Sequence, residues 1–450
     1  MEDIISLAKR RGFVYPASEI YGGLSNAWDY GPLGTILKNN IKNEFIKFFT
    51  VLRDDIVLLD SAIIQNPLVW KASGHIDHFT DPLTDCLSCK KRYRADHLIE
   101  DTLSINVEGL STEDMTKIIE ENSVKCPECG GKLTKVRFFN LMFETHIGPI
   151  DDASNTAFLR PETAQGIFTN FLNITKSTRV TLPFGVLQIG KAFRNEITAG
   201  NFIFRTLEFE QMEIEYFTFP KDSDKAFDKL FEYNSGWYDY IGIKKENLKY
   251  VELSETERAH YSKKTIDIYF KFPFGFKELQ SFANRSDYDL KKHSEHSSKD
   301  LVIFDEKSKK NIRPFVIEPS IGLDRLFLAL LTNGFCIEDV SGEERIVLKL
   351  SHRISPYQVA IFPLVGKGDS LNLSRQIYDD LKLKFRCIYD IGGSIGKRYR
   401  RQDEIGTPKC ITIDPKSLED NMVTIRDRDT MKQDRVKIDK LSEYLNQCFI

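Results

Sequence analysis

Three short segments combine arginines, carboxylates and aromatic rings in a way that suits nucleotide chemistry. Residues 193–196 read Phe-Arg-Asn-Glu, residues 205–209 read Arg-Thr-Leu-Glu-Phe, and residues 322–325 read Gly-Leu-Asp-Arg. Guanidinium groups fork onto phosphate oxygens, and an aromatic ring can stack on adenine. Together the three segments predict a site that activates a carboxylate with ATP.

The first two segments lie in a stretch rich in β-branched and aromatic residues, 186–217. A Thr-Ala-Gly-Asn turn signal at 198–201 interrupts it. This pattern predicts two antiparallel strands joined by a turn.

Side chains alternate between the two faces of a strand, so residue spacing predicts which groups meet. Arg205, Phe209 and Glu213 would share a face of the second strand, and Arg194 and Glu196 a face of the first. We expect the ring to stack on adenine, the arginines to bind phosphates and Glu196 to accept from the exocyclic amine. The alternative is a surface sheet that carries ion pairs.

The third segment follows a predicted strand, 312–317, and a connection, 318–320, that leads into a helix. Arg325 would lie in the first helical turn, where the helix dipole disfavours a cation. An anionic ligand bound by Arg325 would explain a cation at this position. The alternative is an arginine whose aliphatic part covers apolar surface while its charged end reaches solvent. The helix is predicted from the spacing of its apolar residues, namely Leu323, Leu326, Phe327, Leu330 and Leu331.

These segments resemble motifs 2 and 3 of class II aminoacyl-tRNA synthetases. The resemblance runs from about residue 10 to the C-terminus, and motifs this long rarely arise by chance. It implies attachment of glycine to tRNA(Gly) with ATP, through a glycyl-adenylate. The stretches that narrow it to the homodimeric glycyl-tRNA synthetases are 11–13, 18–23, 29–34, 94–97, 159–166 and 318–322.

The resemblance implies an α+β catalytic domain over residues 1–345, with an antiparallel sheet of six to seven strands flanked by helices. A helix at 33–49 precedes a strand at 56–64, which resembles motif 1, the dimer-forming element of the class. Two insertions are expected in this domain, a cysteine-bearing one at about 81–155 and a polar, partly helical one at about 221–264.

Residues 346–450 read as a separate α/β domain with a mixed sheet, and they resemble the anticodon-binding domain of class IIa synthetases. The pattern predicts strands at 359–364, 387–390 and 410–413, with a helix at 370–384. Between the last two strands lies a basic run that would contact the tRNA anticodon or else form a solvated helix face: Lys397, Arg398, Arg400 and Arg401.

The resemblance also assigns roles in the ATP site. Arg194 and Arg325 are the expected catalytic residues: Arg194 bridges the carboxylate and the α-phosphate, while Arg325 and Arg205 hold the other phosphates with Mg²⁺. Glu278 would contact metal or ribose. The full expected ATP set is Arg194, Asn195, Glu196, Phe204, Arg205, Thr206, Leu207, Glu208, Phe209, Glu278, Leu279, Gly322, Leu323, Asp324 and Arg325.

Glycine offers an ammonium, a carboxylate and no side chain, so its site must be small and acidic. Glu162, Glu213 and Glu318 are assigned to the ammonium by the resemblance. One stretch departs from the family, because Lys277 and Ser281 replace glycines beside the ATP site. The expected glycine set is Arg94, Glu162, Phe209, Glu210, Gln211, Met212, Glu213, Glu318, Pro319, Ser320, Ile321 and Gly322.

Two Cys-x-x-Cys pairs suggest a metal site. Cys86 and Cys89 form one pair, and Cys126 and Cys129 the other. Four sulfurs suit a structural tetrahedral zinc site, and four unligated thiols are the alternative. The other cysteines lack such pairing and are expected to be ordinary thiols: Cys336, Cys387, Cys410 and Cys448.

Composition agrees with a large folded chain. The 450 residues are 41% hydrophobic, and the net charge of -3 leaves tRNA contacts to local basic patches. The first eleven residues lack the apolar core of a signal peptide, and no apolar run would span a membrane, so a cytoplasmic location is expected. The expected partners are tRNA(Gly), glycine, ATP and a second copy of the chain.

Two rival functions remain open. A synthetase-like accessory protein would bind nucleic acid without catalysis, and it would be expected to lack the ATP-site arginines, which are present here. Another ligase of the same class would use a different amino acid or acceptor, although three glutamates favour a small amino acid.

Overall fold

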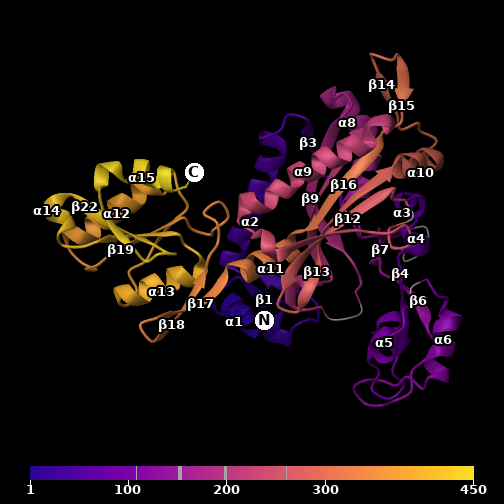
Figure 1. Cartoon of the computed structure of the whole chain (residues 1–450), viewed down its shortest axis with the longest axis horizontal. Coiled ribbons are helices and arrows are strands. Elements are labelled where there is room, and N and C mark those ends of the chain that lie inside the picture. The colour runs from indigo at the N-terminus through magenta and orange to yellow at the C-terminus, as the bar shows by residue number, and fades with distance from the viewer. Residues whose placement is uncertain (108, 150–154, 197–199, 260, 450) are drawn as a thin grey trace.

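A computed structural model describes residues 1–107, 109–149, 155–196, 200–259 and 261–449. Its central element is a seven-stranded sheet (Figure 1). In spatial order the strands are β11 (Leu248–Glu252), β12 (Lys264–Phe272), β13 (Gly275–Ser286), β16 (Phe315–Gly322), β10 (Glu208–Thr218), β9 (Phe184–Phe193) and β3 (Ile56–Leu58).

Neighbouring strands of this sheet are antiparallel, apart from β3, which pairs in parallel with β9 at one edge. The predicted α+β class and the six- to seven-stranded sheet are therefore confirmed. Helices α2 (Pro32–Ile46), α9 (Ser223–Ile241) and α11 (Leu323–Gly334) contribute to one core with apolar side chains from the sheet, such as Met212 and Ile214. The alternation along β10 therefore leaves its odd-numbered residues on the opposite face.

Part of that opposite face is covered by α7 (Ala164–Thr169), α8 (Phe171–Thr178) and α10 (Tyr288–Ser297). Their apolar side chains pack with Phe184, Val186 and Phe217 from the ends of β9 and β10. The stretch 221–264 supplies α9 and the edge strand β11, so it is built into the core and the sheet.

The connection between β9 and β10 differs from the predicted hairpin. Strand β9 ends at Phe193 and β10 begins at Glu208, so Arg194, Glu196 and Arg205 are on the connection between them, which is described at 194–196 and 200–207. Arg194 N still donates to Leu207 O at 2.9 Å, but two other amides bond elsewhere: Asn195 N donates to Leu141 O at 2.7 Å, and Leu207 N donates to Asn26 O at 2.9 Å. The last two hydrogen bonds end the pairing of β9 with β10, and the strand propensity of the sequence does not predict them. The predicted turn at 198–201 falls partly outside the described residues.

Two further element boundaries were predicted wrongly. Strand β16 runs to Gly322, because residues after Ile317 still pair with β10 and β13 on either side. Strand β3 is shorter than the predicted 56–64. The helix after Gly322 begins at Leu323 and places Arg325 in its first turn, as predicted. Helix α2 continues as a π-helical turn, η2 (Lys47–Val51).

The cysteine-bearing region forms a small unit beside the main sheet (Figure 1). It has a separate apolar core, to which Ile99, Met115 and Val136 contribute. Its sheet has the order β5-β4-β6, and its elements are β4 (Thr80–Asp85), β5 (Arg92–Arg94), α5 (Ala95–Leu103), α6 (Thr112–Glu121) and β6 (Arg137–Asn140).

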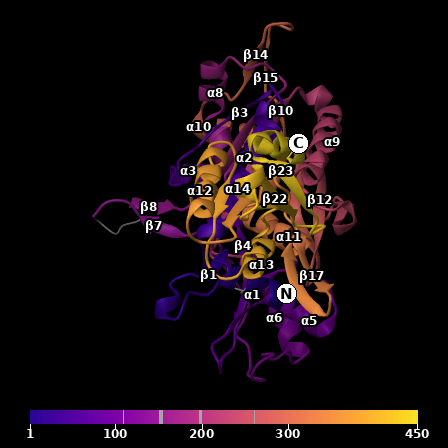
Figure 2. The same ribbon diagram turned by 90° about the vertical axis from the view of Figure 1, so that its left-hand side faces the viewer.

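The C-terminal region is a five-stranded sheet with helices (Figure 2). Its order is β20-β19-β21-β22-β23, with the first three strands parallel and the rest antiparallel, which confirms the predicted mixed sheet. The elements are β19 (Val359–Pro363), α12 (Asp369–Leu381), β20 (Cys387–Tyr389), α13 (Ile395–Ile405), β21 (Lys409–Ile413), α14 (Ser417–Asp420), β22 (Met422–Asp427), β23 (Gln433–Lys437) and α15 (Leu441–Cys448).

A hairpin of β17 (Phe335–Val340) and β18 (Glu343–Leu348) precedes this region along the chain. Among the described helices, none is long and apolar enough to cross a membrane. The remaining α-helices and strands of the described residues are α1 (Glu2–Arg10), β1 (Val14–Pro16), β2 (Trp28–Tyr30), α3 (Pro67–Ala72), α4 (His75–His78), β7 (Glu144–His146), β8 (Thr156–Phe158), β14 (Ile303–Asp305) and β15 (Lys310–Ile312). Short 3-10 helices are η1 (Glu19–Tyr21), η4 (Phe202–Phe204), η5 (Pro220–Asp222), η6 (Lys245–Asn247) and η7 (Ile438–Lys440).

Candidate active site

A cavity of about 340 Å³ lies over the face of the sheet that α9 and α11 leave free. It gathers residues from β10, β12, β13 and β16, from the 194–207 connection and from the first turn of α11. Of the predicted site residues, the following line it: Glu162, Arg194, Glu196, Phe204, Arg205, Thr206, Phe209, Gln211, Glu213, Glu278, Leu279, Glu318, Ser320, Gly322, Asp324 and Arg325.

Three arginines converge at one end of the cavity. The Arg325 guanidinium lies 4.4 Å from the Phe204 ring centroid and donates to Glu278 Oε1 at 3.0 Å. Arg194 lies 5.3 Å from the Phe209 ring, and Arg205 Nε is 3.9 Å from Glu196 Oε2. Burial lowers the pKa of Arg325, as do the other two arginines. Three cations beside an aromatic plate suit a nucleotide polyphosphate.

Carboxylates gather at the other end, and Glu213 is fixed by hydrogen bonds on both oxygens. Its Oε1 accepts from Ser320 Oγ at 2.6 Å and from Gln211 Nε2 at 2.9 Å. Its Oε2 accepts from the Thr163 backbone amide at 3.1 Å and from the Thr163 hydroxyl. Burial, with the Glu162 carboxylate, nevertheless raises the pKa of Glu213.

Glu318 is held by Arg285, a residue that the sequence analysis missed. Arg285 Nη1 donates to Glu318 Oε2 at 2.9 Å, and its Nε and Nη2 donate to the two oxygens of Asp289 at 2.8 Å each. Burial raises the pKa of Glu318 to about 8, although Arg285 lowers it. Arg285 lies on strand β13 and Asp289 on helix α10, so no helical or strand spacing in the sequence pointed to this pair.

Glu162 completes the acidic end. Its Oε1 accepts from Gln165 Nε2 at 2.8 Å, and its Oε2 lies 3.4 Å from His75 Nε2. Burial raises the pKa of Glu162, but the His75 ring and Arg285 outweigh it and hold the pKa well below its usual value. His75 comes from α4, more than eighty residues earlier, and no local pattern pointed to it.

Asp324, in the first turn of α11, connects this helix to strand β10 and to α2 through hydrogen bonds. Its carboxylate accepts from the Glu210 backbone amide at 2.7 Å, from Lys38 Nζ at 3.3 Å and from the Tyr30 hydroxyl. The Glu210 side chain pairs with Lys38 at 2.8 Å and with Lys42 at 3.3 Å. The predicted glycine contact Glu210 therefore lies in this supporting network.

Other predicted site residues lie off the cavity. Arg94 pairs with Asp81 at 3.1 Å and with Asp96 at 2.5 Å, in a neighbouring hollow that shares Phe204 and Arg205 with the cavity wall. The rest of this group lie in the apolar core or on other surfaces, namely Asn195, Leu207, Glu208, Met212, Pro319, Ile321 and Leu323.

The stretch that departs from the family lies in strand β13, and the pairing of β13 with β12 is irregular there: Gln280 pairs with Ile268 and Glu278 with Tyr269, so Leu279 is left out of the register. Ser281 lines the cavity beside Asp267 of β12, while Lys277 lies outside the lining. Burial, with the Glu278 carboxylate, raises the pKa of Asp267 to about 6. Asp267 Oδ1 is buried and has no hydrogen-bond partner among the described residues. Carboxylate oxygens are the ligands that Mg²⁺ prefers, so Asp267 and Glu278 fit a cation at the arginine end.

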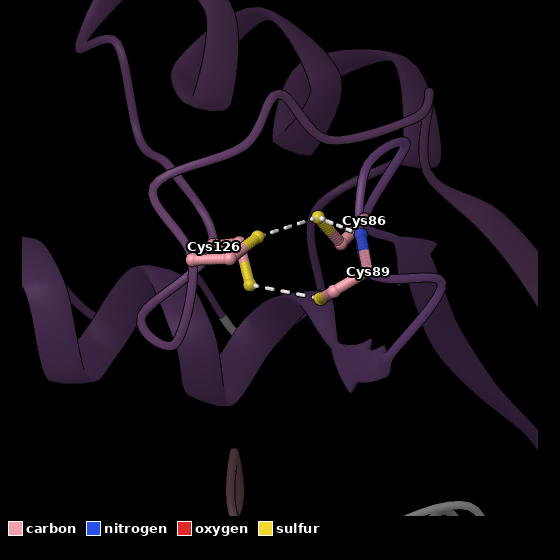
Figure 3. Close-up of side chains that lie close together, drawn as sticks. Cys86, Cys89 and Cys126 are labelled. Atoms are coloured by element: carbon pink, nitrogen blue, oxygen red, sulfur yellow. Dashed lines mark hydrogen bonds between the residues drawn. The ribbon is translucent and has the colours of Figure 1, made fainter.

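The four paired cysteines form a compact sulfur cluster (Figure 3). Their sulfurs all lie within 4.8 Å of one another, with Cys86 and Cys129 at 3.4 Å and Cys89 and Cys126 at 3.6 Å. These separations exceed a disulfide bond and suit corners of a metal tetrahedron. The Tyr93 hydroxyl, 3.1 Å from Cys126 Sγ, lowers the pKa of that thiol to about 6.

Comparisons with known families agree with the fold. Residues 143–334 match the family described as the tRNA synthetase class II core domain (G, H, P, S and T). Residues 358–447 match the family described as the anticodon binding domain. The architecture is that of class II aminoacyl-tRNA synthetases.

Curated relatives extend along nearly the whole chain. The glycine–tRNA ligase of Caldanaerobacter subterraneus subsp. tengcongensis is 51% identical over 453 residues, which cover 99% of this chain and 98% of that protein. Those of Malacoplasma penetrans and Geobacillus thermodenitrificans are 51% and 49% identical, over 97% and 99% of this chain and 95% and 97% of their own lengths. The chain belongs to the glycine–tRNA ligase family.

Proposed function

We propose that this chain attaches glycine to tRNA(Gly) in two steps, through a glycyl-adenylate, and releases AMP. The observation that supports this most directly is the polarity of the cavity, with three arginines at one end and three glutamates at the other. Substrate ATP needs cations along its phosphates, and the ammonium of glycine needs carboxylates. The glycine–tRNA ligases that match along the full chain support the same reaction.

The first step follows from charge. A carboxylate oxygen of glycine attacks the α-phosphorus of ATP, and the bond to the pyrophosphate oxygen breaks with its electron pair. Arg194 would hold the carboxylate and the α-phosphate together, while Arg205 and Arg325 hold the leaving phosphates. Phe209, beside Arg194, would stack on adenine. No side chain acts as nucleophile.

Glu162, Glu213 and Glu318 would hold the ammonium and orient the glycine carboxylate toward Arg194. Each glutamate is itself fixed by neighbours, so the site is organised before glycine arrives. ATP would bind with Mg²⁺, for which Glu278 and Asp267 are the carboxylates at the correct end. When bound, Mg²⁺ would neutralise the negative charge that develops on the leaving pyrophosphate.

The second step transfers glycine to the terminal ribose of tRNA, which the C-terminal domain would hold at its anticodon. Lys397 and Arg400 support this contact, because they line a surface hollow of about 580 Å³ together with Arg11. Arg398 is buried and donates to the Pro363 carbonyl at 2.7 Å. Arg401 is also engaged, with Asp390 at 2.7 Å. Replacing both Lys397 and Arg400 by alanine should weaken tRNA binding and flatten its salt dependence, and an unchanged salt slope would contradict the contact.

We propose that the cysteine cluster holds a structural Zn²⁺ and that the chain forms a homodimer. Apolar side chains near the edge strand β3 support the dimer, because Val51, Leu52, Leu58, Ile64 and Leu68 are all about half exposed or more. Sedimentation of Leu58→Asp should give a monomer where the natural protein gives a dimer. A cytoplasmic location is proposed because ATP and tRNA are found there, and cell fractionation tests it.

Glycine-dependent exchange of labelled pyrophosphate into ATP tests the proposed reaction directly. Glycine should support exchange without tRNA, while alanine and serine should not. Exchange with another amino acid alone would favour a different ligase of the class. A folded protein that binds RNA but supports no exchange, with or without tRNA, would favour an accessory role.

A further inference from the structure

The connection between β11 and β12 forms part of the cavity wall. This connection comprises residues 253–263, of which the structure describes all but residue 260. Three of the described residues line the cavity, namely Leu253, Ala259 and Tyr261. The buried Ser262 fixes this segment to the sheet, because its hydroxyl donates to the Lys264 carbonyl at 2.9 Å and lies 2.7 Å from Thr265 Oγ1. Ser262, the chain neighbour of Tyr261, is therefore anchored to β12 beside the glycine end.

Tyr261 carries the largest side chain of this segment in the cavity. The Arg285 guanidinium lies 4.0 Å from the centroid of its ring and 5.6 Å from the ring of Phe168. Tyr288 lies 5.9 Å from the Tyr261 ring, centroid to centroid. With these neighbours, the position of the Tyr261 ring is set by aromatic and cation–π packing.

Tyr261 faces the acidic end rather than the arginine end. Arg285 lowers its pKa, but burial and the carboxylates of Glu318 and Glu162 raise it above its ordinary value. The other aromatic residues of the lining, Phe204 and Phe209, lie beside Arg325 and Arg194. Among the described lining residues, Tyr261 is thus the aromatic side chain at the place proposed for the ammonium and Cα of glycine.

We propose that the Tyr261 ring is the wall that excludes amino acids with a Cβ atom, so that this residue determines specificity for glycine. The inference rests on the proposed function. A substrate larger than glycine must place its first side-chain carbon beside the ammonium, and a wall fixed by Arg285 and Ser262 cannot recede to admit it. Steric exclusion of this kind needs no second, editing site.

The test uses pyrophosphate exchange with glycine and alanine on the full-length protein. Tyr261→Ala opens the wall, so the ratio of kcat/KM for glycine to that for alanine should fall by about tenfold or more, the range that one methylene supplies. Tyr261→Phe keeps the ring and should leave the ratio close to that of the natural protein. Tyr261→Leu, which keeps apolar bulk for folding, should lower the ratio by an intermediate factor.

Tyr250→Ala serves as the matched control, because Tyr250 lies on β11 outside the lining and should leave the ratio unchanged. An unchanged ratio in folded Tyr261→Ala, or in Tyr261→Leu if the alanine variant does not fold, would overturn the inference. A different result would contradict the proposed function, namely no glycine-dependent exchange by the natural protein. The two failures can therefore be told apart.

Discussion

At the scale of single residues, the cavity owes its chemistry to charges that are held before any substrate arrives. The Arg285 side chain is only 3% exposed, and its guanidinium forms ion pairs with Asp289 and Glu318. It thereby compensates part of the negative charge that three glutamates bring into a buried space. In the empty site burial also raises the pKa of Glu318 and of Glu213, so protonation removes part of the remaining negative charge, and the ammonium of glycine would take over this compensation when it binds.

Arg194→Ala should abolish adenylate formation while the fold is retained. The side chain is proposed to neutralise charge on both the glycine carboxylate and the α-phosphate, and loss of one such donor lowers kcat by about 10²- to 10³-fold or more. Pyrophosphate exchange measures the loss, and circular dichroism checks the fold. Arg194→Lys should recover little, because ammonium lacks the forked geometry. Natural exchange rates in folded Arg194→Ala would contradict the assigned role.

The pH dependence of glycine binding follows from Glu318, whose pKa burial raises to about 8. Below that pH the empty site holds a proton on Glu318, and glycine must displace it. The KM for glycine should therefore fall as pH rises toward 8, by up to about tenfold per unit on the acid side. Steady-state kinetics between pH 6 and pH 8 would measure this.

Glu318→Gln should raise the KM and flatten its pH profile, since the amide does not titrate. Glu252→Gln, on the exposed side of β11, is the matched control and should keep the natural profile. If Glu318→Gln retains the full slope, the titrating group is another residue of the cavity.

At the scale of elements, two connections between strands carry functional groups. The 194–207 connection brings Arg194 and Arg205 to the cavity, and its backbone is tied to Leu141 and Asn26. The cysteine cluster joins the β4–β5 turn to the segment before β6, so a metal there would close a small unit with a limited core of its own.

Cys126→Ser should remove the bound zinc and loosen this unit. Metal analysis of the natural protein should give about one ion per chain, since four thiolates complete a tetrahedral site. The variant should give less metal and faster proteolysis within residues 86–136. Cys336→Ser, outside the cluster, should change neither property. A natural protein that is metal-free yet resists proteolysis equally well would refute the zinc proposal.

At the scale of the whole molecule, a buried ion network joins the hairpin to the C-terminal domain. Arg345 of β18 is 0% exposed, and it donates to Asp403 of α13 at 2.9 Å and to Glu338 at 2.6 Å. Asp403 also accepts from Arg426 of β22 at 2.9 Å. Glu404, the next residue of α13, pairs with Arg10 and Arg11 of the N-terminal region. These contacts link the hairpin and the N-terminal region to the C-terminal domain.

Arg345→Met should destabilise the C-terminal domain by less than the about 3–5 kcal/mol that an unpaired buried charge costs, because Asp403 keeps Arg426 and the partly exposed Glu338 keeps Lys349. Urea unfolding followed by a probe in that domain would show the midpoint shift. Arg435→Met removes a partly exposed arginine of the same domain and should cost about 1 kcal/mol or less. Equal effects of the two substitutions would show that the buried network contributes no more than a surface pair.

The sequence by itself determined the fold class, the mixed sheet of the C-terminal domain, the first-turn position of Arg325 and the pairing of the cysteines. These features depend on local periodicity, on helix start signals and on motifs whose residues are close in the chain. Most of the ATP and glycine residues that the family resemblance implied also line the cavity, and on β10 the alternation of side chains places Phe209, Gln211 and Glu213 on that face.

Only the tertiary structure decided which charges compensate one another. His75 reaches Glu162, Arg285 reaches Glu318, and Lys38 reaches Asp324 across long separations that no spacing rule relates. The strand ends at Phe193 and Gly322 were likewise decided by which neighbouring backbone was available to bond. Local propensity describes a segment alone, whereas a buried polar group must find its partner wherever the fold brings one.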